Sequence, residues 1–201
     1  MKINIKTNNK EFAKKMTNLQ KKQIPFASSQ AINQTLFGLK KEMFKQTEKK
    51  LDRPTRATQN GFEIKKSNKQ NLTGILKIKD FVSKYLHYQI EGGVRSTGRK
   101  IPVPYKPNAR LNKFGNIQRN AQGGVIKRPN KQFIAKINGV SGVYEKFGRG
   151  GKQIKLIIGF EDSVVYDKKI FPFYKIANGY INNTYNRKLQ KALTRAMKTA
   201  R

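Results

Sequence analysis

The sequence contains no cysteine, and its 201 residues include a single histidine. Without cysteine, the chain forms no disulfide and offers no thiolate ligand to a metal ion. It also lacks any apolar run close to the roughly 20 residues that a membrane-spanning helix needs. Residues 1–5 do not have the apolar core of a signal peptide. We therefore expect no membrane partner, and an intracellular origin is compatible with the absence of thiols.

Acidic residues are scarce. The chain has 11 Asp and Glu against 44 Lys and Arg, which gives a formal net charge of +33. Such an excess of one sign repels itself in the compact state, and binding to a polyanion relieves the repulsion. Nucleic acid and an acidic protein surface are both suitable partners, whereas an anionic membrane is the weakest of the three candidates.

Residues typical of catalysis are also sparse. His87 has no serine motif around it and no cysteine to pair with, so we interpret it as a strand or loop residue. Glu161, Asp162 and Asp167 have the chemistry of a magnesium site, but they follow a predicted strand and are interpreted as turn residues. The glycine-rich residues 148–153 depart from the phosphate-loop spacing and predict a hairpin turn. We therefore expect no enzymatic activity, no metal and no cofactor.

Apolar residues recur at helical spacing between residues 9 and 51. Asn9 is a suitable cap for a first helix, whose apolar face consists of Phe12, Met16 and Leu19. Pro25 interrupts this helix, because proline lacks the N–H and clashes with the preceding turn, but it suits the first position of a second helix. The second helix reaches about Leu51, and its apolar face consists of Ile32, Leu36, Leu39 and Met43.

The helical pattern stops at Asp52, Arg53 and Pro54. The residue before a proline disfavours the helical region, so the helix ends by Arg53. We interpret these three residues as a structural helix stop. The small polar residues 55–61 then predict a surface connection to the first strand.

Alternating apolar residues predict strands in two regions, residues 62–91 and 132–170. The second region includes a hairpin around the turn at residues 148–151. From about Pro172 the apolar spacing becomes helical again and continues to residue 201, with cations on the opposite face.

Between the strand regions, residues 92–131 contain four prolines, several glycines, many cations and no acid. We interpret this stretch as a long basic arm. Its arginines are interleaved with Tyr105 and Phe114, which suits contact with phosphates and bases and suits protein docking equally well. The arm and the last helix supply the candidate contacts with DNA or a partner, namely Arg95, Arg99, Lys100, Arg110, Lys113, Arg119, Lys127, Arg128, Arg187, Lys188, Lys191 and Arg195.

These patterns together predict a single α+β domain over residues 1–201. An N-terminal helical part, residues 9–51, precedes an antiparallel sheet of four or more strands. A C-terminal helix, residues 172–201, packs on that sheet, and the basic Pro/Gly-rich arm, residues 92–131, extends from it.

Several segments also occur in a distinctive order. The first half of the chain contains, in turn, QIPFASSQAINQTLFGLKKEM, LDRPTRAT, LTGILKIKDF and KYLHYQIEGGVR, and the chain closes with KALTRAMKTAR. This ordered set resembles the prophage minor tail protein Z family, the tail-completion proteins of tailed bacteriophages. The resemblance covers about the first half of the chain and the last helix, and it does not extend to the arm.

The resemblance implies a non-enzymatic structural protein of the virion, made in the cytoplasm of the bacterial host. Several copies would form a homo-oligomeric ring at the tail or the head–tail neck, joining connector, neck and tail subunits, with nonspecific contact to packaged DNA as a further interaction. The alternative is a stand-alone nucleic-acid-binding protein without sequence specificity. A phage nuclease or other processing enzyme is the third and least favoured candidate.

Overall fold

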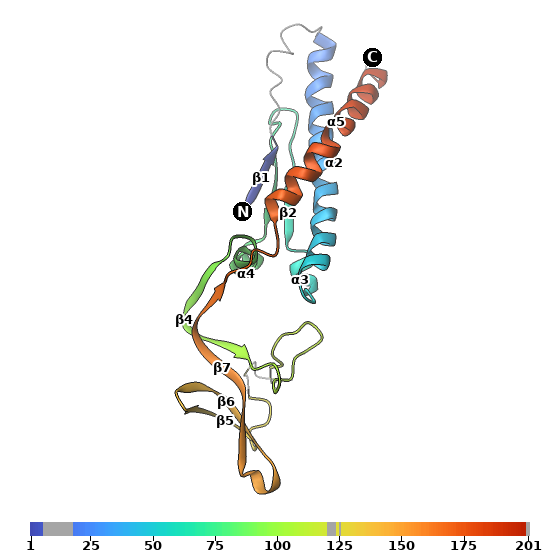
Figure 1. Ribbon diagram of the computed structural model, residues 1–201. Coiled ribbons are helices and arrows are strands. Elements are labelled where there is room, and N and C mark those ends of the chain that lie inside the picture. The colour runs from blue at the N-terminus through green and yellow to red at the C-terminus, as the bar shows by residue number, and fades with distance from the viewer. Residues whose placement is uncertain (6–17, 120–123, 125, 200–201) are drawn as a thin grey trace. The chain divides into compact units, whose positions relative to one another are not determined.

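The computed structural model describes residues 1–5, 18–119, 124 and 126–199, and the chain forms two compact units. Unit 1 consists of residues 1–90 and 170–201, and unit 2 consists of residues 91–169. Unit 1 contains the long helices, whereas unit 2 is built mainly of strands (Figure 1). The α+β class is therefore confirmed, with two units in place of the single domain expected from the sequence.

Helix α2 spans Asn18–Lys50 and contains Pro25 in its interior. The predicted break at Pro25 is wrong, because one helix of 33 residues runs through it. A proline inside a helix costs about 3 kcal/mol, since it removes a hydrogen bond and clashes with the preceding turn. Ile24 and Ala27 are buried on either side of Pro25, and this packing offsets the local penalty. The predicted cap Asn9 and the apolar residues Phe12 and Met16 lie outside the described residues.

The predicted apolar face of α2 is confirmed, because its members Ile32, Leu36, Leu39 and Met43 are all fully buried. The predicted helix stop is confirmed as well, since α2 ends at Lys50. Arg53 has a φ of 46°, a left-handed conformation in which an α-helix does not continue. Its guanidinium also pairs with Asp52 at 3.0 Å.

The residues after the stop form more than the predicted surface connection. Thr55 caps a short helix, α3 (Arg56–Gln59), by accepting a hydrogen bond from the backbone N–H of Thr58. Thr58 itself is buried, and its hydroxyl lies 2.9 Å from the hydroxyl of Tyr85. The turn after Pro54 is therefore tied to another part of unit 1 through polar side chains.

Unit 1 contains a three-stranded antiparallel sheet in the order β1-β3-β2. Its strands are β1 (Lys2–Ile5), β2 (Phe62–Lys65) and β3 (Gly74–Ile78). The predicted alternation in β3 is confirmed, because Gly74, Leu76 and Ile78 are buried and the residues between them are less so. Strand β1 was not predicted, since four residues are too few to show a period.

Residues 80–91 form helix α4 (Asp80–Glu91), so the prediction of strands throughout 62–91 is wrong for this part. The buried residues Val82, Leu86 and Ile90 follow one another at four-residue spacing, which is helical. The aromatic residues around them, which favour strands in isolation, masked that spacing. Packing of this apolar face against the unit 1 core decides the outcome.

Helix α5 (Phe173–Thr199) packs along α2 (Figure 1). The contact region contains the buried residues Ala27 and Ala31 of α2 and Ala192 and Ala196 of α5, whose small side chains allow the helices to approach closely. At the other end of α5, Phe173 stacks on Phe62 of the sheet with ring centroids 6.2 Å apart. No helix in the described part of the chain is both long and apolar enough to cross a membrane.

Unit 2 contains a separate four-stranded antiparallel sheet in the order β4-β7-β6-β5, so the strand regions predicted to form one sheet belong to two sheets. The strands are β4 (Gly93–Pro104), β5 (Gln132–Ile137), β6 (Val140–Phe147) and β7 (Gln153–Tyr166). The hairpin turn predicted at residues 148–151 joins β6 to β7. Asn138 and Gly139 join β5 to β6 with φ values of 49° and 82°, which is the backbone that a two-residue hairpin requires.

The predicted arm is wrong for residues 93–104, because they form β4 and pair with β7. The described residues between β4 and β5 form turns and a bridge between Leu111 and Ile117. Residues from this segment cover a small core of Val143, Ile157 and Ile158 in the sheet. The pairing of β4 with β7 satisfies backbone groups that an extended arm would leave to solvent.

Candidate nucleic-acid interface

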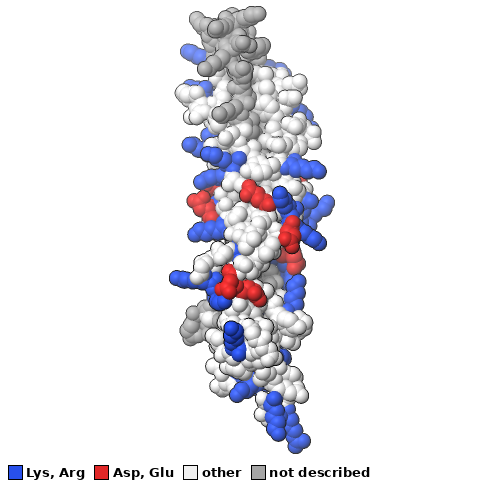
Figure 2. Space-filling model, turned by 60° about the vertical axis from the view of Figure 1, so that its left-hand side comes forward, with Lys and Arg blue, Asp and Glu red and all other residues white. Residues whose placement is uncertain are grey.

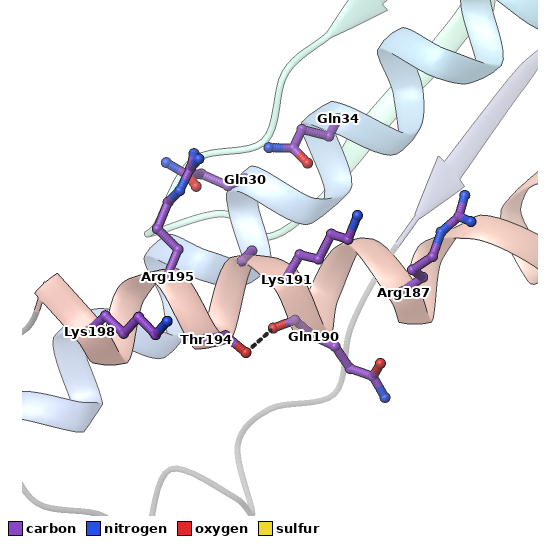
Figure 3. A pocket seen from close by; sticks show the side chains of 9 residues that line it. Gln30, Gln34, Arg187, Gln190, Lys191, Thr194, Arg195 and Lys198 are labelled. Atoms are coloured by element: carbon purple, nitrogen blue, oxygen red, sulfur yellow. Dashed lines mark hydrogen bonds between the residues drawn. The ribbon is translucent and has the colours of Figure 1, made fainter.

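A groove of about 680 Å³ lies between α2 and α5 in unit 1. Four cations follow one another along α5, and two amides of α2 lie across from them (Figure 3). The described residues that line it are Gln30, Gln34, Arg187, Gln190, Lys191, Ala192, Thr194, Arg195 and Lys198. The structure therefore brings together three of the cations predicted as contacts, and it adds Lys198, Gln30 and Gln34.

Helical spacing explains why these side chains meet. Arg187, Lys191, Arg195 and Lys198 are separated by four, four and three residues, so they lie on one face of α5. Gln30 and Gln34 are one turn apart on α2. The alanines that pack the two helices together leave little bulk between them, so the long polar side chains of both helices border one groove.

No acid in either helix segment offsets this charge. Neither α5 nor residues 18–41 of α2 contain Asp or Glu. These two segments therefore supply no carboxylate of their own to the groove. Such a concentration of one sign in a concave surface raises the local concentration of anions.

Lys188 does not line the groove, although the sequence predicts it as a contact. Its ammonium donates hydrogen bonds to the backbone oxygen of Gln34 at 2.9 Å and to the hydroxyl of Tyr180 at 3.4 Å. Burial lowers the pKa of Lys188, and the neighbouring charge of Arg187 lowers it further. Lys188 thus connects α5 to α2 within the protein.

The predicted contacts in unit 2 do not form one surface. Arg95, Arg99 and Lys100 belong to β4, where the ammonium of Lys100 pairs with the carboxylate of Asp162 at 2.7 Å. The ammonium of Lys113 lies 5.1 Å from the ring centre of Phe114. Arg119 is exposed at the end of a described stretch.

Arg110, Lys127 and Arg128 do come together, around a hollow of about 320 Å³ in unit 2. This hollow also contains Glu145, whose carboxylate lies 3.6 Å from Lys155 and 4.0 Å from Arg128. Burial alone would raise the pKa of Glu145, but the hydrogen bond from Gln132 and the two cations together lower it. The internal carboxylate makes this hollow a less favourable anion site than the groove of unit 1.

The four residues weighed as catalytic candidates lie in a helix, in a strand or directly after a strand. His87 lies in α4 and not in a strand or loop, and its Nδ1–H donates to the backbone oxygen of Ser83 at 2.6 Å. Glu161 and Asp162 lie within β7 and not in a turn, and Asp167 follows that strand. Among the described residues, no group of three or more His, Cys, Asp or Glu is arranged to hold a metal ion.

Lysine and arginine side chains occur at many separate places on the face shown in Figure 2, where acidic side chains are fewer. The groove differs from this general background because its cations share one concave surface. Three comparisons, with protein-family models, with curated protein sequences and with solved structures, found no match for the chain. The function is therefore inferred from the sequence and from the geometry of the chain itself.

Proposed function

We propose that the protein is a structural component of a tailed-phage virion, located at the tail or the head–tail neck, where several copies assemble with connector and tail subunits. The observation that carries the proposal is the ordered set of segments that resembles the minor tail protein Z family. Four of these segments lie, in chain order, on α2, on the helix stop with α3, on the strand β3, and on the helix α4 with the start of β4. The fifth belongs to α5.

The surface of unit 2 supports a role in assembly. Val94 and Val165 are directly opposite each other in the β4–β7 ladder, and they are 57% and 60% exposed. Ile134 on the edge strand β5 is 60% exposed. Exposed apolar side chains on a sheet with a small core are typical of a surface that a neighbouring subunit covers. We assign the Val94–Val165 pair to contact with another copy of the chain.

The proposal is tested on purified particles. Mass spectrometry of nuclease-treated, intact virions should detect the protein at a fixed ratio to the other virion proteins. Nuclease treatment removes proteins attached only to exposed DNA. Absence of the protein from intact particles, with abundant protein in the infected cell, would overturn the proposal.

A matched pair of variants tests the assigned surface. Val94→Lys with Val165→Lys places charges on the exposed apolar pair and should block incorporation into particles. Ser96→Lys with Ser163→Lys adds the same charges two residues along the same ladder, on the same face, and should leave incorporation unchanged. Equal incorporation of both variants would show that the valines do not mediate assembly.

The second candidate is a stand-alone protein that binds nucleic acid without sequence specificity. The groove between α2 and α5 favours it, because four cations converge on one surface whose described lining contains no acid. Absence from virions together with strong binding to duplex DNA would favour this second candidate over the first.

A further inference from the structure

We propose that the groove between α2 and α5 binds the phosphate backbone of duplex DNA. This inference deepens the second candidate function by naming its site and ligand, and it does not depend on the virion role. The lining favours a polyanion, because its described residues include four cations and no acid. A single small anion would engage only part of that row.

The length of the row suits a linear polyanion. Arg187 and Lys198 are 11 residues apart in one helix, which separates their backbones by about 16 Å. A duplex carries one negative charge per roughly 1.7 Å of its axis, so a segment of this length offers on the order of ten phosphates. The row of four cations therefore matches a ligand whose charges are closely spaced along its length.

The side chains across the groove suit phosphate as well. Gln30 and Gln34 carry amide groups that donate hydrogen bonds, and such amides commonly contact phosphate oxygens in protein–DNA complexes. Arg187 and Arg195 present planar donor groups that match two oxygens of one phosphate. The lining thus combines charge with directional donors from two helices.

The same lining disfavours the other polyanions. Acidic protein partners are generally held by aromatic or large apolar anchors at the centre of the interface, whereas Ala192 is the only apolar residue among the described residues that line this groove. Single-stranded nucleic acid is held by stacking of bases on aromatic rings, and the described lining of the groove contains no aromatic residue. Duplex DNA needs neither feature, because its phosphates lie outside and its bases are stacked.

The test uses the full chain and a labelled duplex of arbitrary sequence, with binding measured by fluorescence anisotropy over a series of salt concentrations. The groove variant carries Arg187→Gln, Lys191→Gln, Arg195→Gln and Lys198→Gln. The control variant carries Lys45→Gln, Lys49→Gln, Lys50→Gln and Lys175→Gln, four exposed cations of the same two helices that do not line the groove. Both variants lose the same net charge.

Each phosphate contact contributes about 0.9 to the slope of log K against log salt. We expect the groove variant to lower the magnitude of that slope by about 3 to 4, and the control variant to lower it by less than about 1. Equal losses in the two variants would overturn the proposed site while leaving general nucleic-acid binding intact. If the unaltered chain does not bind duplex DNA, the site and the second candidate function both fail, and the virion proposal is unaffected.

Further measurements keep the outcome clear. Circular dichroism and thermal unfolding verify that the variants fold, and Lys191→Gln alone should lower the slope by about 1 if the quadruple variant does not fold. Single-stranded DNA, double-stranded RNA and polyglutamate serve as competitors. Duplex DNA should compete best, and stronger competition by polyglutamate, lost in the groove variant, would overturn DNA as the ligand in favour of an acidic protein.

Discussion

The two units of the chain achieve stability in different ways. Unit 1 buries a continuous core, in which side chains of α2, the three-stranded sheet, α4 and the first turns of α5 meet. In the described part of unit 2, the four-stranded sheet buries a small cluster around Val143, Ile157 and Ile158. Hydrogen bonds between its strands satisfy the backbone N–H and C=O groups, while several large apolar side chains remain exposed. Unit 1 is therefore stabilised mainly by burial, and unit 2 depends more on hydrogen bonding and on what covers it.

The largest expected effect is the loss of stability when one core residue is truncated in each unit. Leu36→Ala in unit 1 should lower the free energy of unfolding by about 3 to 5 kcal/mol, because Leu36 is fully buried in a rigid core. Ile158→Ala in unit 2 should cost only about 2 kcal/mol, since its partly buried neighbours can collapse into the space.

Hydrogen exchange measured by mass spectrometry reports the stability of each unit separately. The exposed Phe37→Ala, next to Leu36 in sequence, is the control and should change stability by less than about 1 kcal/mol. Equal losses at Leu36 and Ile158 would contradict the contrast between the units.

An effect of intermediate size is expected where α2 and α5 pack closely in unit 1. A Cβ on Gly38 of α2 would overlap the hydroxyl of Tyr180 and lie 2.9 Å from the ammonium of Lys188. Gly38→Ala should therefore destabilise the protein by about 1 kcal/mol, at the low end of overpacking because both atoms are at the ends of side chains. Gly179→Ala is the matched change in α5, where a Cβ meets nothing within 4 Å, and it should stabilise by about 0.5 to 1 kcal/mol.

Both glycine variants are measured by chemical denaturation. A stabilising Gly38→Ala would show that α2 and α5 are not held closely at this point. A destabilising Gly179→Ala would indicate that glycine is required there for a reason other than space.

The smallest expected effect concerns pH and unit 2. The pKa of Glu145 is lowered in the folded chain, so its contribution to stability is fully present above the ordinary carboxyl pKa. That contribution is lost as the pH falls through the lowered pKa.

Glu145→Gln should therefore reduce the stability of unit 2 at neutral pH and weaken the decline of that stability in acid. Unfolding of unit 2 at neutral and acidic pH measures the change, with the exposed Glu161→Gln as the control. An unchanged acid dependence in Glu145→Gln would contradict the assignment.

The candidate site was only partly predictable from the sequence. Arg187, Lys191 and Arg195 were predicted as contacts because they lie on the face of the last helix opposite its apolar stripe. Lys198 continues the same spacing and could have been included on that ground. Gln30 and Gln34 could not, because nothing in a one-dimensional pattern says which part of α2 packs against α5. The separate role of Lys188 also depends on that packing, since its partners Gln34 and Tyr180 are distant in sequence.

The sequence by itself determined the elements whose cause is local. Four-residue apolar spacing defines the buried face of α2, Pro54 limits the length of that helix, and the glycines at residues 148–151 form the turn between β6 and β7. These features follow from backbone geometry within a few residues of each position. The net charge is likewise a property of composition alone.

Only the tertiary structure decided the rest. Helix α2 continues through Pro25 because burial of Ile24 and Ala27 outweighs a local penalty. Residues 80–91 are helical because Val82, Leu86 and Ile90 pack into the core of unit 1. Residues 93–104 form a strand because their backbone pairs with β7. The groove exists because alanines from distant parts of the chain bring two helices together. In each case the deciding free energy comes from contacts between residues far apart in sequence, which no local pattern records.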